Sequence, residues 1–164
     1  DLWERSVLVA SLAFVAAKRW TYVNPDQALL AGLMHGMGRM YIITRSSDHP
    51  GLFANSASFR EMLRTWHAPI ARMVLESWDI APDIVTAVEQ YEQLDRVNSG
   101  EADLTDVLTI ADILASHHGD ALALEVQLAE ASASRRMGIT QDTVARVLEE
   151  SADELASLNA ALGG

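Results

Sequence analysis

Three side chains of this sequence stand out as groups able to bind a metal ion or move a proton: His35, His67 and Asp112. Imidazoles and carboxylates hold the catalytic metals of many hydrolases, with an open position left for an activated water. Each residue also has a structural interpretation. His35 stands among Leu and Met residues, as a hydrogen-bonded core histidine would, and His67 stands just before Pro69 at an expected helix start. Asp112 is the most informative, because a carboxylate within an apolar helix must find a donor if it is buried.

Other reactive patterns are absent from the sequence. It has no cysteine, no phosphate-binding glycine loop, no G-x-S-x-G nucleophile turn and no H-E-x-x-H zinc motif. His117 and His118 are adjacent, but neighbouring residues of a helix face different directions. Because Gly119 follows them, we interpret the pair as the end of a helix, where imidazole meets the helix dipole favourably.

The charge of the chain excludes two classes of partner. The 164 residues carry a formal net charge of −11, which opposes binding to nucleic acid or to an anionic membrane surface. Arg135 and Arg136 form the best candidate for a basic patch, and it is a weak one. The apolar run from Val7 ends at Lys18, short of the roughly 20 residues that span a bilayer. We therefore expect a cytoplasmic protein, and the lack of cysteine fits a reducing compartment.

The hydrophobic spacing is helical throughout, so we predict an all-α, single-domain helical bundle over residues 1–164. The first helix is expected at 2–20, and the second after the capping pair Asn24 and Pro25, with a bend at Gly36 and Gly38. Residues 46–58 are rich in turn formers and are predicted to be the one substantial loop. The remaining expected helices are 59–66, one opened by Pro69, one opened by Pro82, one capped by Asp103 and ended by Gly119, and two at 121–136 and 140–162.

Five segments, in this order and spacing, resemble the HDOD branch of the HD superfamily of metal-dependent phosphohydrolases. They are LWERS at 2–6, NPDQALLAGL at 24–33, AGLMHGMGRMYI at 31–42, WHAPIARMVLESWDIAPDIVTAV at 66–88 and TIADILA at 109–115. The third is the most specific, since the family helix reads approximately GLLHDIGKLVL. The resemblance runs from the middle of a typical HDOD domain to its end, and it implies an HD-type bundle. The chain opens on Asp1 without Met, so we expect the family's usual N-terminal helices to lie upstream.

The departures from the family pattern are as informative as the matches. Arg5 stands where the family has its first histidine, and a guanidinium cannot bind a cation. His35 is followed by Gly36 in place of the bridging aspartate. His67 and Asp112 are retained. The resemblance therefore implies a vestigial HD pocket with no catalytic residue, metal ligand or cofactor assigned, formed by Arg5, His35, Gly36, His67, Gln90, Tyr91 and Asp112, in which Gln90 and Tyr91 replace paired histidines.

From this pattern we interpret the chain as a non-catalytic signal-transduction or scaffolding module that acts through protein contacts. The resemblance implies a bacterial signalling protein, whose partners are other signalling proteins or an upstream domain of the same chain. One alternative is a divergent metal-dependent phosphohydrolase or cyclic-nucleotide phosphodiesterase using His35, His67 and Asp112. Another is a module that binds a nucleotide or small phosphate in the vestigial pocket, with Arg5 meeting the anion.

Two structural expectations follow. Arg5 and Asp112 should share one pocket beside His35 and His67, because the matching family residues converge on one site. The beginning of the first helix, with Leu2, Trp3 and Val7, should expose apolar surface that favours self-association.

Overall fold

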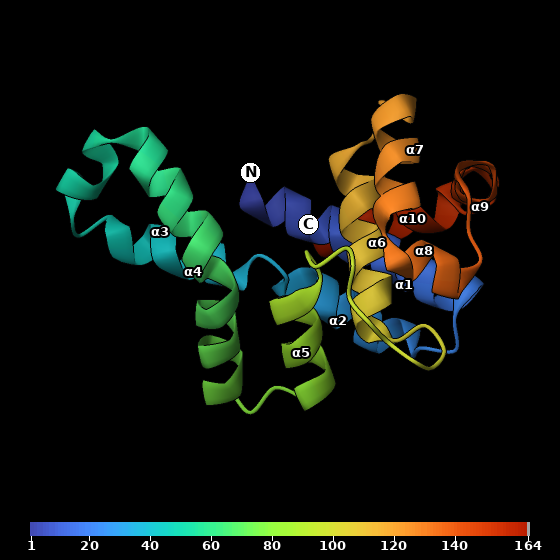
Figure 1. Ribbon diagram of the computed structural model, residues 1–164, viewed down its shortest axis with the longest axis horizontal. Helices are drawn as coiled ribbons and strands as arrows, with labels where there is room; N and C mark the ends of the chain where they lie inside the picture. The colour runs from blue at the N-terminus through green and yellow to red at the C-terminus, as the bar shows by residue number, and fades with distance from the viewer. Residues whose placement is uncertain (164) are drawn as a thin grey trace.

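The long helix α1 (Leu2–Trp20) passes through the middle of the protein, and other helices cover it (Figure 1). A computed structural model describes residues 1–163, except for the side chain of Phe53, and it shows the predicted all-α fold: no strand occurs among these residues. The elements after α1 are α2 (Pro25–Met34), α3 (Met37–Ser46), the short 3-10 helix η1 (Pro50–Ala54), α4 (Ser56–Ser77), α5 (Pro82–Gln90), α6 (Leu104–Ser116), α7 (Ala121–Glu130), α8 (Ser132–Met137), α9 (Gln141–Glu150) and α10 (Ala152–Gly163).

Small residues bring α1 and α2 unusually close together. Ala10 and Ala13 of α1 and Ala31 of α2 are fully buried. At Gly32 an added Cβ would lie 2.4 Å from the Cα of Ala10, so only glycine fits at this crossing. The start of α2 is fixed by a neighbouring residue. The side chain of Asn24 accepts hydrogen bonds from the backbone amides of Asp26 and Gln27, as the sequence predicted.

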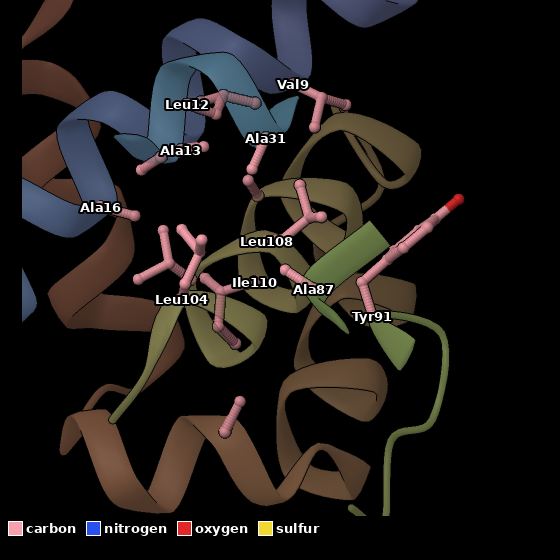
Figure 2. Close-up of a cluster of buried hydrophobic side chains, with 14 of the residues drawn as sticks. Val9, Leu12, Ala13, Ala16, Ala31, Ala87, Tyr91, Leu104, Leu108 and Ile110 are labelled. Carbon is pink, nitrogen blue, oxygen red and sulfur yellow. The ribbon is translucent and has the colours of Figure 1, made fainter. Parts of the chain in front are cut away.

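The hydrophobic core lies where α1, α2, α5 and α6 meet. Helix α6 is buried over almost its whole length, which its near-continuous apolar sequence requires. Figure 2 shows the inward-facing side chains of this cluster, among them Val9, Leu12, Ala13, Ala16, Ala31, Ala87, Tyr91, Leu104, Leu108 and Ile110. This packing holds the first turns of α1, the α2–α3 junction and the end of α5 around one face of α6.

Helix α3, η1 and the first part of α4 form an arm that extends away from this core, whereas the last part of α4 packs into the core with Ala71 and Leu75 (Figure 1). Helix α3 packs on α4 at Gly38, where an added Cβ would lie 1.9 Å from the carbonyl oxygen of His67. The close approach fixes α3 against the middle of α4. It thereby determines where Arg39, the next residue, is placed.

The predicted break before Pro69 is wrong, because α4 is one continuous helix from Ser56 to Ser77 with Pro69 inside it. Proline removes a single backbone donor, whose partner in a regular helix is the carbonyl of Thr65. Both residues are exposed, so water can satisfy that carbonyl. The predicted loop at 46–58 is also shorter than expected, since it contains η1, and the side chain of Asn55 starts α4 by accepting hydrogen bonds from two backbone amides.

The two long C-terminal helices predicted at 121–136 and 140–162 are each divided in two. The first breaks at Ala131, where the backbone turns extended and the amide of Ser132 donates to the carbonyl of Leu94 at 2.8 Å. The second breaks at Ser151, between α9 and α10. The separation at Gly138 is as predicted, with a left-handed φ of 65°.

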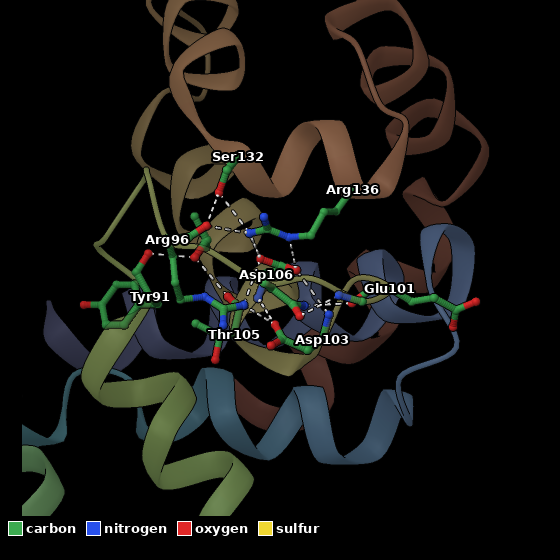
Figure 3. A network of polar contacts seen from close by, with 11 residues as sticks. Tyr91, Arg96, Glu101, Asp103, Thr105, Asp106, Ser132 and Arg136 are labelled. Carbon is green, nitrogen blue, oxygen red and sulfur yellow. Dashed lines mark hydrogen bonds and ion pairs between the residues drawn. The ribbon is translucent and has the colours of Figure 1, made fainter.

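A buried carboxylate joins the linker after α5 to α6 and α8. Asp106 is 1% exposed, and it accepts hydrogen bonds from Arg136 at 2.7 and 2.8 Å and from Arg96 at 3.0 Å (Figure 3). It also completes a reciprocal cap with Asp103 at the start of α6. Arg136, part of the candidate basic patch, therefore has an internal structural partner.

The expected apolar surface at the start of α1 is present in part. Leu2 and Trp3 are exposed, whereas Val7 is buried and does not contribute to it. No helix within residues 1–163 is both long enough and apolar enough to cross a membrane.

Candidate functional site

A cavity of about 300 Å³ opens between the first turns of α1, the α2–α3 junction, the end of α5 and the last turns of α6. Five of the seven residues predicted for the vestigial pocket line it: Arg5, His35, Gly36, Tyr91 and Asp112. The other residues that line it are Leu2, Ser6, Arg39, Glu92 and Ser116. Segments far apart in the sequence are thus brought together by the packing of α1, α2 and α5 on α6.

The predicted contact between Arg5 and Asp112 is present. The Nη2 atom of Arg5 lies 2.7 Å from Oδ1 of Asp112 and also donates to the hydroxyl of Ser116 at 2.7 Å. The side chains of Arg5 and Asp112 are 35% and 23% exposed, so the ion pair is half-buried rather than sealed from water. Asp112 therefore has its charge partner within the protein.

His35 is a buried core histidine at the inner wall of the cavity. Its Nδ1–H donates to the carbonyl of Gly32 at 2.6 Å, and its ring packs edge-on against Tyr91 with centroids 5.7 Å apart. Burial lowers the pKa of His35, although the hydrogen bond to Gly32 opposes this effect. The ring is therefore uncharged at neutral pH, and its Nε2 atom keeps a lone pair.

Beside Gly36, where the family resemblance implies an aspartate, one buried polar group has no partner among the described residues. The Oγ atom of Ser6 is buried, lines the cavity and makes no hydrogen bond with any residue that the structure describes. A Cβ added at Gly36 would lie 3.5 Å from this hydroxyl. An acidic side chain at position 36 would thus begin within reach of Ser6, which is the donor it would need.

Arg39, which also lines the cavity, is the centre of a second charged cluster. It donates to Glu92 at 2.6 Å and to the hydroxyl of Tyr91 at 2.9 Å. His67 is buried, and its Nε2 lies 2.8 Å from Glu92 and 3.3 Å from Arg39. Because a carboxylate only accepts, Nε2 carries the proton in its contact with Glu92.

Electrostatics keep the members of this second cluster in fixed charge states. Burial alone would favour the neutral form of Glu92, but hydrogen bonds from His67 and Arg39 outweigh it and lower the pKa of Glu92 to about 2. Burial raises the pKa of the Tyr91 hydroxyl, which keeps its proton. The cluster is therefore an ion pair with a neutral phenol beside it.

Two of the predicted pocket residues lie outside the cavity wall. His67 is behind it and reaches it only through Glu92 and Arg39. Gln90 is half-buried at the end of α5 and is not among the lining residues, because its neighbour Tyr91 takes the inward direction.

Sequence reasoning missed Ser6, Arg39, Glu92 and Ser116 as members of this site. Arg39 stands within the most specific family segment, but the junction between α2 and α3 separates it from His35, so helical spacing gave no signal for it. Glu92 adjoins Tyr91, but nothing local indicates that it contacts Arg39. Ser116 is four residues after Asp112 on α6, which places both on one face.

The residues present do not fit the metal that HD hydrolases bind. Within residues 1–163, no group of three or more His, Asp or Glu side chains is arranged to hold a metal ion. Asp112 is paired with Arg5, His67 donates to Glu92, and Glu92 is paired with Arg39. Only the Nε2 lone pair of His35 keeps the character of a ligand, and one nitrogen ligand does not make a hydrolytic metal centre.

The fold and the pocket define an all-helical protein of the HD type. The sequence profile of the HDOD domain matches residues 1–94, and the chain belongs to that family. No curated protein matches the sequence.

Two solved structures are similar to the whole fold. One is a candidate metal-dependent phosphohydrolase from Shewanella amazonensis SB2B, with 26% identity and a TM-score of 0.77, in which the match covers 98% of this chain and 58% of that one. The other is an HDOD domain protein of unknown function from Geobacter sulfurreducens, with 17% identity and a TM-score of 0.66, covering 98% and 61%. The chain thus spans about three fifths of the length of either relative.

Proposed function

We propose that this domain is a non-catalytic signal-transduction or scaffolding module that acts through protein contacts. The observation that carries the proposal is the ion pair of Arg5 with Asp112. Arg5 stands at a position where the family resemblance implies a metal-binding histidine. Its guanidinium is a cationic group, and it bonds to Asp112, the carboxylate that matches the last ligand of the active pattern.

Electrostatic repulsion supports the same conclusion. A divalent cation placed in the cavity would approach the guanidiniums of Arg5 and Arg39, which both line it. To bind Asp112 it would have to displace Arg5 from a charge-assisted contact, and Glu92, the other carboxylate among the described lining residues, is paired with Arg39. The pocket therefore keeps its shape through internal ion pairs in place of a metal.

Metal content and turnover test the proposal directly. Protein purified without chelator or affinity tag should contain no stoichiometric manganese, iron or zinc. It should hydrolyse neither bis-p-nitrophenyl phosphate nor a cyclic dinucleotide when manganese or iron(II) is added. Turnover that disappears in His35→Ala but persists in His118→Ala, a matched exposed histidine outside the cavity, would overturn the proposal.

A second candidate function is the binding of a nucleotide or another small phosphate in the same cavity. The observation that favours it is the buried hydroxyl of Ser6, which has no partner among the described residues and belongs to the same cavity lining as Arg5 and Arg39. A ligand that binds only the folded state raises the melting temperature. Thermal shifts with inorganic phosphate, nucleoside monophosphates and cyclic dinucleotides, compared between the wild type and Ser6→Ala, test this candidate.

A further inference from the structure

An apolar groove lies on the arm, on the face where α3, η1 and α4 meet. Its volume is about 260 Å³, and its apolar lining includes Ile42, Leu52, Met62, Trp66 and Ile70. Met62, Trp66 and Ile70 are spaced four residues apart and so lie on one face of α4. Trp66 is 54% exposed and Leu52 is 44% exposed, so a substantial apolar surface faces solvent here.

The segment of the chain that carries this groove has a net charge opposite in sign to that of the rest of the chain. Residues 37–78 contain five of the 12 basic residues but only three of the 23 acidic ones. Arg45 and His49 lie at the groove itself, and Arg45 packs over the ring of Tyr41. Its guanidinium forms no ion pair with the residues described by the structure. The groove thus combines an apolar floor with an unpaired positive charge.

Helix α7 has the complementary properties. Leu122 and Val126, four residues apart, are 72% and 46% exposed, and only Leu128 of this helix is buried. Glu125 and Glu130 are exposed on the same short helix, which contains no basic residue. Helix α7 therefore presents an apolar pair bordered by negative charge.

We infer that the groove of one molecule binds α7 of a second copy of this chain. Helix α3 and η1, which contribute to the groove, lie toward one end of the long axis of the molecule and α7 lies toward the other, so one copy cannot fill its own groove (Figure 1). Leu122 and Val126 enter between α3 and α4, while Glu125 and Glu130 face the basic residues of the arm. Such a contact is heterologous, joins molecules head to tail, and extends to a ring or a chain.

The interface deepens the proposed scaffolding role and rests on it, since it names a second copy of the domain as one protein partner. The non-catalytic role and the interface with a second copy can nevertheless be refuted by different results. Turnover in the pocket would overturn the non-catalytic role without involving Trp66 or Leu122. A strictly monomeric protein would remove this interface and leave the ion-paired pocket as it is.

Sedimentation velocity of the purified chain, at concentrations rising to about 1 mM, where weak contacts become populated, tests the inference. Trp66→Ser removes the groove, and Leu122→Ser removes the entering side chain. Each is expected to weaken association by about tenfold or more, as loss of a central apolar contact does. Val97→Ser is the matched control, because Val97 is 90% exposed and belongs to neither surface. Circular dichroism confirms that each variant is folded.

Mixing the two defective variants separates a head-to-tail contact from other modes of association. Trp66→Ser retains an intact α7, and Leu122→Ser retains an intact groove, so together they should form a dimer that cannot grow further. High salt should weaken this dimer, because part of the attraction is between opposite charges. A wild type that stays monomeric, or a mixture of the two variants that stays monomeric, overturns the inference.

Discussion

Replacing Arg5 by methionine should destabilise the domain by about 1–2 kcal/mol. The guanidinium makes two contacts of 2.7 Å, to Asp112 and to Ser116, and the side chains of the ion pair are 35% and 23% exposed. Exposed pairs contribute roughly 0.2–1 kcal/mol, whereas breaking a fully buried pair costs about 3–5 kcal/mol. The half-buried pair falls between these limits, since methionine retains the packing of the stem but leaves Asp112 without its positive partner.

Urea denaturation at neutral pH measures this change, and a double-mutant cycle with Asp112→Asn isolates the pairwise energy. The matched control is Arg64→Met. Arg64 pairs with Glu61 at 2.6 Å, but the two side chains are 76% and 60% exposed, so water screens the pair and its loss should be much less destabilising than the loss of Arg5. If Arg5→Met is no more destabilising than this control, or if the coupling to Asp112 is zero, the guanidinium does not hold the pocket together.

Three further predictions follow from the same structure. Asp106→Asn should cost about 3–5 kcal/mol in urea denaturation, because it removes the buried negative charge that pairs with Arg96 and Arg136, whose side chains are only 13% and 14% exposed; a loss below about 1 kcal/mol would contradict this reasoning. The pKa of Glu92 is lowered in the folded state to about 2, so its stabilisation is complete above its unfolded pKa near 4.5 and is lost as pH falls toward 2. Because Glu92 is partly exposed, this contribution is about 1 kcal/mol, and Glu92→Gln should flatten the stability profile over that window, whereas an unchanged profile would exclude the effect. Gly38→Ala should lower stability by about 1–3 kcal/mol in thermal denaturation, since its Cβ would meet the backbone of His67, while Gly51→Ala, with open space around it, should not.

Helix starts with a local cause were predictable from the sequence. Asn24 and Asp103 cap α2 and α6 as expected, and Gly138 adopts the left-handed conformation that ends α8. In each case one side chain or one glycine satisfies the backbone within a few residues, so no distant partner is needed. The break at Ala131 had no such signal, because it depends on a hydrogen bond between Ser132 and Leu94.

The same division holds for the site. The family resemblance indicated Arg5, His35, Gly36 and Asp112 as one pocket, and the structure places them around one cavity. The family resemblance did not indicate Arg39 and Glu92, which form a salt bridge although they lie 53 positions apart in the sequence. A salt bridge of this kind forms only where the packing of two helices brings the charged side chains together. The sequence of one helix does not indicate which charged residue of the other will lie beside it.

The sequence by itself determined that this protein is helical, which residues start and end several helices, and which side chains a family pocket would bring together, because these depend on local hydrogen bonding, hydrophobic spacing and motif order. Only the tertiary structure decided which charges meet. The packing of α1 on α6 sets Arg5 against Asp112, and the close approach of α3 and α4 at Gly38 positions Arg39. Both contacts depend on the distance and the angle between packed helices, to within the size of one side chain. That geometry is set by the packing of the whole core and not by any one helix.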